Sequence, residues 1–342
     1  GGYYEANAFG INGEWVENYG GWNLWRDDAF LVKFDSTGQV EFLHSIGTPN
    51  DESIHTVTAD ELGDVIVSGA TNQSTGIFKF DEQTGRPGHP NDYGFFIAKY
   101  DGSDGHCVWA HMGGGLYNYS QIIGEDACLG ENNTLFLSGR IRGTVSVSPN
   151  SYYSYDQNAY LAKFDSQGNN LWLEVIGGQN SSEYGVSCTY GNGRVAVCGK
   201  LFSNQPYVGD FPLYSTQTGG SFDAFNALFD TQGELLWARG NNSSSSSNFY
   251  PACVLIDESG NQLYWGEFKA TQDFYPVTVS HTGSNFKMFL ARFLPFSANP
   301  ASTVSAGPDK STTCGTYVTL DGAVTPSSAP FGWWPDLGFL AN

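Results

Sequence analysis

The sequence predicts an all-β fold, and three observations lead to this prediction. Glycine accounts for 43 of the 342 residues and aromatic residues for 15%, whereas charged residues make up only 15%, against about 25% in average soluble domains. Such a composition suits strands and tight turns better than helices. Long apolar patterns with the period of a helix are absent. The third observation is an internal repeat, because one strand-like segment recurs along most of the chain.

Each repeat begins with a short apolar run that ends at a turn. The first copy reads DAFLVKFDSTG from Asp28 to Gly38, and related segments begin at Tyr93, Asn158, Asp223 and Lys287. The residues that end the run are 66, 64, 65 and 64 positions apart, and they are Asp35, Asp101, Asp165, Asp230 and Leu294. A period this regular indicates repeated supersecondary units that stack on one another.

Three further runs complete each repeat. Four residues after the turn glycine comes a large aromatic residue, at Phe42, Trp109, Trp172 and Trp237. A glycine, a polar stretch, a third apolar run, a turn and a fourth run that ends in glycine follow in the same order. Short apolar runs joined by Gly- and Asn-rich turns are typical of hairpins. Each unit is therefore predicted to be a four-stranded antiparallel meander, with about 20 less regular residues before the next unit.

The first run of each unit predicts how the units pack. In an extended strand, Phe30, Val32 and Phe34 point to one face of the sheet, whereas Ala29 and Leu31 point to the other. Both faces are apolar, although a sheet packed on one side only would alternate apolar and polar residues. Blades that stack radially bury both faces. Residues 1–296 are therefore predicted to form a β-propeller.

The two ends of this segment predict how the ring closes. Residues 1–21 align with the second half of a repeat, whereas residues 286–294 align with its first strand alone. The N-terminal strands and the C-terminal strand would then share one closing blade, which leaves no open sheet edge. Four complete units and one split unit give five four-stranded blades.

The repeat pattern stops after Phe296. Residues 297–306 have the small, Pro-containing composition of a linker. Residues 307–342 match no repeat and are too few to form a good core by themselves. They are predicted to be the first strands of a second, incomplete domain.

The charge of the chain excludes nucleic acid as a partner and disfavours docking on anionic lipid. Its 15 Lys and Arg residues stand against 35 Asp and Glu, which gives a net charge of −20. Nucleic-acid binders need clustered cations to neutralise phosphates, and anionic lipids attract basic segments. No window of 18 apolar residues exists, so no membrane span is expected.

The repeated pattern D-A-F-x-x-K-F-D-x-x-G-x-x-x-W resembles the SBBP β-propeller repeats of secreted bacterial proteins over nearly all of residues 1–296. The tail A-G-P-D-K-x-x-x-C-G-T-x-V-T-L, with W-P-x-x-G-F from Trp334 to Phe339, is similar to the opening of Ig-like or PKD-like domains of Bacteroidetes surface proteins. The resemblance implies a propeller followed by the beginning of an Ig-like β-sandwich. It also implies an extracellular or cell-surface location reached by type IX secretion. The partners would include the secretion machinery and further domains of the same precursor.

Carboxylates in the turns are candidate calcium ligands. Asp101 and Asp104 lie three residues apart in the sequence DGSDG, and the equivalent turn aspartates are Asp35, Asp165 and Asp230. The alternative is that each aspartate caps backbone N–H groups while the following glycine takes a positive φ. A full calcium site needs six to eight oxygen ligands, and no EF-hand sequence is present. We therefore expect capping, with at most peripheral Ca²⁺ and no other cofactor.

Two cysteines face each other across a predicted hairpin. Cys188 and Cys198 lie on the third and fourth strands of one unit, on either side of the turn sequence GNG. A disulfide between them is one interpretation, and two buried thiols are the other. Cys128 and Cys253 occupy the position equivalent to Cys188 without a partner on the fourth strand, which favours thiols there.

Aromatic residues outside the repeat positions are the candidate binding residues. The tryptophans share one repeat position, which predicts a place in the blade core. The candidates lie in loops and are Tyr117, Tyr119, Tyr152, Tyr153, Tyr155, Tyr207 and Tyr214. Loops on a rigid scaffold commonly carry function. Exposed rings beside polar residues could stack on sugars, and the alternative is that long loops pack onto the rim of the propeller.

The sequence contains no Walker A, G-x-S-x-G or H-E-x-x-H motif. We therefore expect a non-enzymatic secreted or cell-surface module that binds a glycan or protein ligand through its inter-blade loops and serves in adhesion. An extracellular propeller enzyme that acts on polysaccharide or peptide is the alternative. A structural spacer, or a cargo of the secretion machinery, is a third hypothesis. Because the net charge is −20, the ligand should be neutral or cationic.

Overall fold

The computed structural model is built almost entirely of strands. The described residues are 2–4, 8–19, 26–72, 78–80, 83–85, 93–178, 182–202, 206–213, 222–243, 249–269, 272–273, 278–279, 285–293, 303–305 and 323–325. Within them one 3-10 turn, Glu131–Asn133, interrupts an otherwise all-β structure. The all-β prediction is therefore confirmed. These residues contain no helix with the length and apolar character that a membrane crossing requires.

The chain divides into two compact units, Gly1–Leu294 and Pro295–Asn342. The division lies close to residue 296, where the predicted repeat segment ends. The described elements of the second unit are β27 (Thr303–Ser305) and β28 (Ala323–Thr325), which pair antiparallel. Strand β27 lies inside residues 297–306, so the segment expected as a linker contains a strand.

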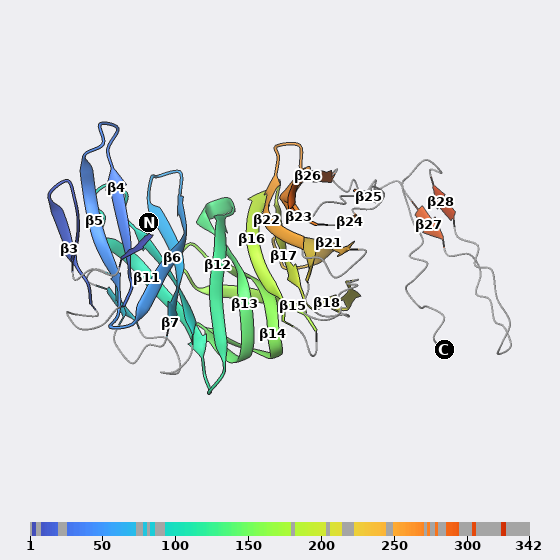
Figure 1. Cartoon of the computed structure of the whole chain (residues 1–342), viewed down its shortest axis with the longest axis horizontal. Helices are drawn as coiled ribbons and strands as arrows, with labels where there is room; N and C mark the ends of the chain where they lie inside the picture. The colour runs from blue at the N-terminus through green and yellow to red at the C-terminus, as the bar shows by residue number, and fades with distance from the viewer. Residues whose placement is uncertain are drawn as a thin grey trace. The chain divides into compact units, whose positions relative to one another are not determined.

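The first unit is a series of antiparallel sheets, which Figure 1 follows from blue to orange. The first sheet has the order β1–β4–β5–β8–β9, and β2 and β3 form a separate hairpin. The strands are β1 (Gly2–Tyr4), β2 (Ala8–Ile11), β3 (Glu14–Glu17), β4 (Asp28–Phe34), β5 (Val40–Gly47), β8 (Phe78–Phe80) and β9 (Gln83–Gly85).

Four more groups of paired strands follow along the chain. Three are four-stranded, with the orders β6–β7–β10–β11, β12–β13–β14–β15 and β16–β17–β20–β21, and the last is β22–β23–β26. A short pairing of β11 with β13 joins the second group to the third. The strands are β6 (Asp51–Ala59), β7 (Val65–Asn72), β10 (Gly94–Tyr100), β11 (Cys107–Gly115), β12 (Gln121–Leu129), β13 (Leu135–Val147), β14 (Asn150–Phe164), β15 (Asn170–Gly177), β16 (Tyr184–Gly191), β17 (Arg194–Leu201), β20 (Asp223–Asp230), β21 (Leu235–Ser243), β22 (Phe249–Ile256), β23 (Gln262–Phe268) and β26 (Lys287–Phe293).

This grouping corrects the predicted blade. The less regular residues between the fourth and first strands were expected to separate one sheet from the next. Instead the fourth strand pairs directly with the first strand of the following repeat, as β7 pairs with β10 and β17 with β20. The less regular segments fold back and extend the preceding sheet. They do so through β8 on β5, β18 (Tyr207–Val208) with β19 (Phe211–Pro212) on β15, and β24 (Gln272–Asp273) with β25 (Thr278–Val279) on β21.

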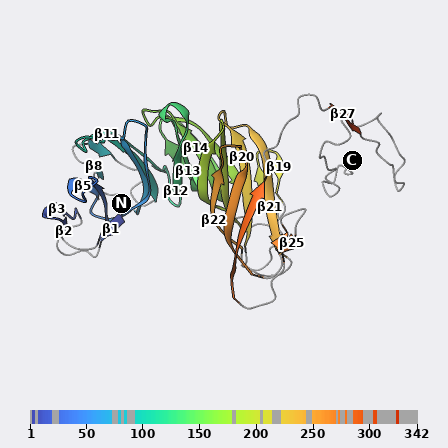
Figure 2. The same ribbon diagram turned by 90° about the horizontal axis from the view of Figure 1, so that it is seen from above.

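The expected closing blade, shared by both ends of the chain, is also corrected. Strand β26 pairs with β23, while β1 pairs with β4, and the described strands include no pairing between the two ends. The physical reason is the shifted grouping, because each sheet combines the end of one repeat with the beginning of the next. Strand β1 and strand β26 therefore belong to different sheets. Figure 2 shows β5 and β22 in separate sheets of this unit.

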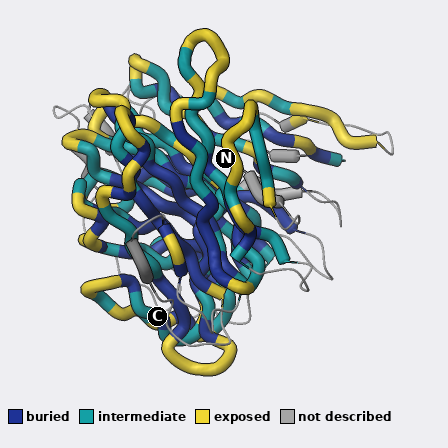
Figure 3. Tube along the Cα trace, turned by 90° about the vertical axis from the view of Figure 1, so that its left-hand side faces the viewer, coloured by how far each residue is buried: buried dark blue, intermediate teal, exposed yellow. Residues whose placement is uncertain are grey.

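Consecutive sheets pack face to face. On β10, Phe96, Ala98 and Tyr100 enter the core shared with the first sheet, whereas Phe95 and Ile97 enter the core shared with the third. Complete burial of a large apolar side chain contributes about 1.5–3 kcal/mol. The same alternation recurs on β14 and β20. The first strands of the internal repeats, β10, β14 and β20, are thus buried on both faces, as predicted, and Figure 3 shows exposed residues concentrated at the turns.

An aromatic residue on the second strand of a repeat packs against the turn of the next repeat and so joins one sheet to the next. The Trp172 ring lies 3.2 Å from the position that a Cβ would take on Gly233, and its Nε1–H donates to the Thr231 carbonyl at 3.3 Å. Trp109 donates in the same way to the Ser166 carbonyl at 3.1 Å. Gly233 has φ +92°, so the turn needs glycine for its backbone as well as for the ring. The same packing recurs at Trp109 with Gly168 and at Phe42 with Gly105.

Replacing Trp172 by Ala should lower the free energy of unfolding by roughly 2–4 kcal/mol, because the variant loses both the ring packing and the indole hydrogen bond. Urea unfolding followed by tryptophan fluorescence and circular dichroism would measure the loss. Trp15→Ala is the matched control, since Trp15 is 71% exposed, and it should change stability by less than about 0.5 kcal/mol. Equal effects of the two substitutions would contradict the interlocking role of Trp172.

Candidate functional site

The strands of each sheet run between two edges of the first unit. Tight turns gather at one, the hairpin edge, and its turns are residues 35–39, 60–64, 101–106, 130–134, 165–169, 191–193, 230–234 and 257–261. Connections between sheets and between repeats gather at the other, the loop edge, whose described parts include residues 48–50, 116–120 and 148–149. The antiparallel order of the strands separates the two kinds of connection, so each edge presents its own set of side chains.

The loop edge carries most of the predicted tyrosines. Their exposed fractions are 66% at Tyr117, 83% at Tyr119, 63% at Tyr153, 69% at Tyr155 and 40% at Tyr207. Tyr93, which the sequence analysis did not single out, is 42% exposed just before β10 at the same edge. Tyr93 directly precedes a repeat strand, so the sequence pattern grouped it with the residues that build the sheet and not with the loops.

Two of these tyrosine groups approach the same part of β13. The N–H of Leu116 donates to the Thr144 carbonyl at 2.8 Å, which places the turn with Tyr117 against this strand. Tyr153 lies directly opposite Thr144 in the ladder between β13 and β14. Tyr207 lies farther along the sheet, opposite Gly177 at the end of β15. The fold therefore brings the turn that contains Tyr117 and the strand segment that contains Tyr153 to the same part of β13.

Tyr152 differs from its neighbours. Its hydroxyl donates to Asn170 Oδ1 at 2.6 Å, and its ring packs against the core between the second and third sheets. Burial raises the pKa of the hydroxyl. Successive side chains of a strand point to opposite faces of the sheet. Tyr153 and Tyr155 therefore share one face of β14 and point to solvent, whereas Tyr152 points to the other face. Tyr214 lies outside the described residues.

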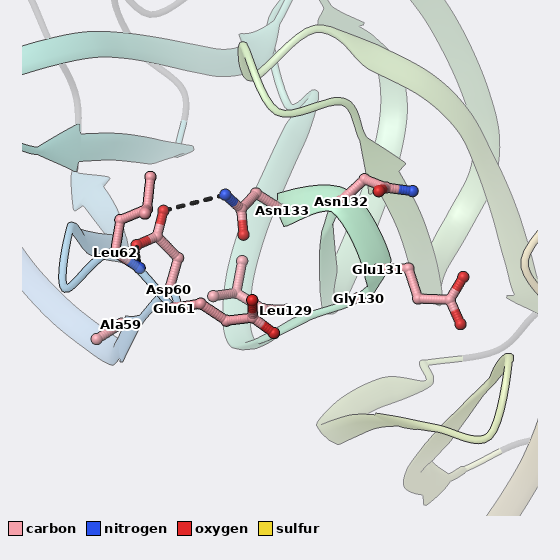
Figure 4. A pocket seen from close by; sticks show the side chains of 9 residues that line it. All are labelled: Ala59, Asp60, Glu61, Leu62, Leu129, Gly130, Glu131, Asn132 and Asn133. Atoms are coloured by element: carbon pink, nitrogen blue, oxygen red, sulfur yellow. Dashed lines mark hydrogen bonds between the residues drawn. The ribbon is translucent and has the colours of Figure 1, made fainter.

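A second candidate is a hollow of about 610 Å³ at the hairpin edge. Figure 4 shows that it lies between two turns, one from the second sheet and one from the third. Its lining is Ala59, Asp60, Glu61, Leu62, Leu129, Gly130, Glu131, Asn132 and Asn133. The sequence analysis missed it, because the two turns are separated by about 70 residues and neither carries a motif.

The charge of Asp60 is already compensated by the protein. Lys99 Nζ lies 2.9 Å from Asp60 Oδ2 and 2.8 Å from Asp64 Oδ2, and Asn133 Nδ2 donates to Asp60 at 3.2 Å. Burial raises the pKa of Asp60, but the bonds from Lys99 and from backbone N–H groups outweigh it and lower the pKa. Glu61 and Glu131 are exposed, so they are the carboxylates that a cationic group could reach.

The turn aspartates act as caps. Asp35 Oδ1 accepts bonds from the hydroxyl and N–H of Thr37 and from the N–H of Gln39, and these bonds lower its pKa. Equivalent backbone bonds reach Asp165, at 3.0 and 2.8 Å, and Asp230, at 2.8 and 2.9 Å. This geometry fits the capping interpretation of the D-x-x-G turns.

One of these turns also groups three metal-ligating side chains. Asp101, Asp104 and His106 each place one ligand atom within 4.8 Å of the others. His106 Nδ1 lies 2.7 Å from Asp104 Oδ1, and both side chains are more than half exposed. The sequence analysis paired only the two aspartates. Three ligands, two exposed and one half-buried, with Asp101 also bonded to Ser103, fall short of the six to eight oxygens that hold Ca²⁺ firmly.

The register of the strands excludes the disulfide interpretation for Cys188 and Cys198. Cys188 lies opposite Val197, and Cys198 lies opposite Ser187. The two side chains therefore point to opposite faces of the sheet, and they enter different cores. Both are buried free thiols. Hydrogen bonding with Cys128, together with burial, raises the pKa of Cys188.

A buried carboxyl pair joins the first sheet to the second at the loop edge. Asp28 is 0% exposed and Glu52 is 2% exposed. A Cβ on Gly47 would lie 2.8 Å from Asp28 Oδ1 and 3.0 Å from Glu52 Oε2, so both carboxyls converge on this glycine. Thr48 and Thr71 bond to Glu52. The third repeat has the same arrangement with Asn158, Gly177 and Glu183.

Burial and neighbouring negative charges disfavour ionisation of this pair. Burial, together with the Glu52 charge, raises the pKa of Asp28 to about 7, and burial raises that of Glu52 to about 7. Both groups titrate near pH 4 in an unfolded chain. The folded state therefore holds more protons between pH 4 and 7, and stability must fall as the pH rises through this window.

We expect the free energy of unfolding to drop between pH 5 and pH 8 by roughly 2 kcal/mol for each carboxyl. Asp28→Asn, which copies Asn158 of the third repeat, should flatten this pH dependence. Asp35→Asn is the control, because its pKa is lowered and its contribution changes only below pH 4. Urea midpoints measured at both pH values decide the matter, and an unchanged slope in Asp28→Asn would contradict the assignment.

No protein-family model matches the sequence, and no curated protein matches it. The likeness to SBBP repeats therefore depends on the repeat residues themselves.

Proposed function

We propose that this chain is an extracellular binding module that holds a glycan or protein ligand at its loop edge and catalyses no reaction. One observation carries the proposal. Tyr117, Tyr119, Tyr153 and Tyr155 come from two separate segments, are 63–83% exposed and adjoin the same stretch of β13. A monomeric fold gains nothing by leaving such rings in water, whereas rings with a polar tip are common anchors in interfaces.

The scaffold favours binding at this edge. Tyr153 and Tyr155 lie on β14, and Tyr117 and Tyr119 lie in the turn between β11 and β12, which bonds to β13 through Leu116. Strands β13 and β14 are themselves fixed by the core between the second and third sheets. The rings can therefore meet a ligand with little loss of backbone entropy. Flat sugar faces and peptide side chains are the surfaces on which tyrosine rings stack.

The charge of the chain supports a neutral or cationic ligand. A net charge of −20 repels anions at long range. Screening beyond about 8 Å in physiological salt leaves short contacts to set the affinity. Anionic glycans are therefore poor candidates.

We propose further that the sheets are five blades of an SBBP-type β-propeller on a chain exported by type IX secretion, with an Ig-like domain after it. The face-to-face stacking of repeat-built sheets supports the propeller, and the repeat pattern supports the family. Secretion, adhesion and the secretion machinery as partner are proposed on that resemblance alone.

Replacing Tyr117, Tyr119, Tyr153 and Tyr155 together by Ala should weaken adhesion to cells or to a glycan array at least about tenfold, because stacking contacts of this kind carry most of the energy of an interface. The melting temperature should stay nearly unchanged, since all four rings are exposed. Trp15→Ala, which removes an exposed ring from the β2–β3 hairpin, is the control and should bind like the natural chain. Unchanged adhesion in the fourfold variant, or turnover of a glycan or peptide by the purified chain, would contradict the proposal.

We propose that calcium binds at most peripherally, at Asp101, Asp104 and His106. Adding a chelator should therefore shift the melting temperature by no more than about 2 °C, because weak binding at an exposed site stabilises little by mass action. Scanning calorimetry with and without Ca²⁺ measures the shift. A loss of many degrees would show a structural ion instead.

A further inference from the structure

Two cysteines from consecutive sheets meet in the core between the third and fourth sheets. Cys188 of β16 is 5% exposed and belongs to this core, and Cys128 of β12 packs against it. Ala127, the neighbour of Cys128, is buried instead in the core between the second and third sheets. Successive side chains of a strand point to opposite faces. Cys128 therefore faces the fourth sheet, while Cys188 faces the third.

Hydrogen bonds place the Cys188 sulfur beside Cys128. The Cys188 Sγ atom lies 3.5 Å from the Asp126 carbonyl oxygen and 3.8 Å from that of Phe136. Phe136 is the residue directly opposite Cys128 in the ladder between β12 and β13. The N–H of Cys188 also donates to Asp126 Oδ2 at 3.0 Å, which fixes β16 against β12. The two thiols are close enough to form a hydrogen bond with each other.

We propose that Cys128 and Cys188 are a modification site, at which a small disulfide such as oxidised glutathione closes the two thiols to a disulfide between the third and fourth sheets. Both side chains leave their strands towards the same interface, and neighbouring sulfurs on facing strands are what such a bond requires. The bond would join covalently two sheets that packing alone otherwise holds together. Disulfides persist outside the cell, where the chain is proposed to act.

The half-buried Cys128 is the point of entry, because Cys188 is buried. The Cys128 thiolate attacks one sulfur of oxidised glutathione, whose S–S bond breaks, so that a mixed disulfide forms and one glutathione leaves as a thiolate. Cys188 then loses its proton, and its sulfur attacks that of Cys128, which releases the second glutathione as a thiolate. The released thiolates take up the protons that the two cysteines lost. Two cysteine thiols are thereby oxidised, and one glutathione disulfide is reduced to two glutathione thiols.

Peptide mass spectrometry of the folded chain tests the proposal, after treatment with oxidised glutathione and blocking of the remaining thiols. The natural chain should yield the peptides of Cys128 and Cys188 joined to each other, lighter by two hydrogen atoms than the separate peptides together. Cys128→Ser should lack this joined pair. Cys253→Ser is the matched control, because Cys253 is also half-buried but its sulfur accepts a bond from the Ser187 hydroxyl at 3.5 Å. This control should form the joined pair like the natural chain.

Thermal melting shows whether the bond fits the spacing of the two sheets. The bond closes a loop of about 60 residues, so the oxidised natural chain should melt roughly 5–10 °C above the reduced chain. Cys128→Ser should melt at the same temperature before and after the treatment, and circular dichroism confirms that each variant folds. A natural chain that forms no link between Cys128 and Cys188, that links Cys188 to another cysteine, or that melts lower once the link has formed would overturn the proposal.

Discussion

The structure depends on one constraint, which is that the first strand of each internal repeat buries both of its faces between two neighbouring sheets. No single sheet of this chain can form a core, because alternate residues of β10, β14 and β20 enter different cores. Each internal sheet packs against a neighbour on either side, and the ring of Phe42, Trp109 or Trp172 over the next turn glycine sets the spacing. Stability in such a series is a sum over neighbouring interfaces.

This constraint leaves the edges of the sheets for function. Side chains inside the stack are committed to packing, whereas the turns and connections only have to satisfy their own backbone. At the hairpin edge the turn aspartates accept capping bonds from backbone N–H groups, as Asp35 does. The loop edge keeps rings such as Tyr119 and Tyr155 in water.

Sequence predicted the all-β class, the repeat and the two-faced burial, because period and apolar pattern are local properties. The sequence could not predict which strands share a sheet. The long connection between β7 and β10 has the same composition whether these two strands pair with each other or belong to different sheets. The register of β16 and β17 places Cys188 and Cys198 on opposite faces of the sheet, which the sequence alone does not reveal. Likewise Tyr152 and Tyr153 are adjacent in sequence but lie on opposite faces of β14. The convergence of Asp28 and Glu52 on Gly47, and the hollow beside Asp60, arise from segments that meet only in the fold.

Hydrogen exchange, measured residue by residue at a concentration where the chain is monomeric, tests the central claim most directly. If burial between two sheets holds the fold, amides of β10, β14 and β20 should exchange at least about 100-fold more slowly than those of β26, which has the same repeat sequence pattern but exposes Met288 and Leu290 by 78% and 71%. Equal protection of β26 and the three internal strands would contradict this account, because burial of the second face would then contribute nothing.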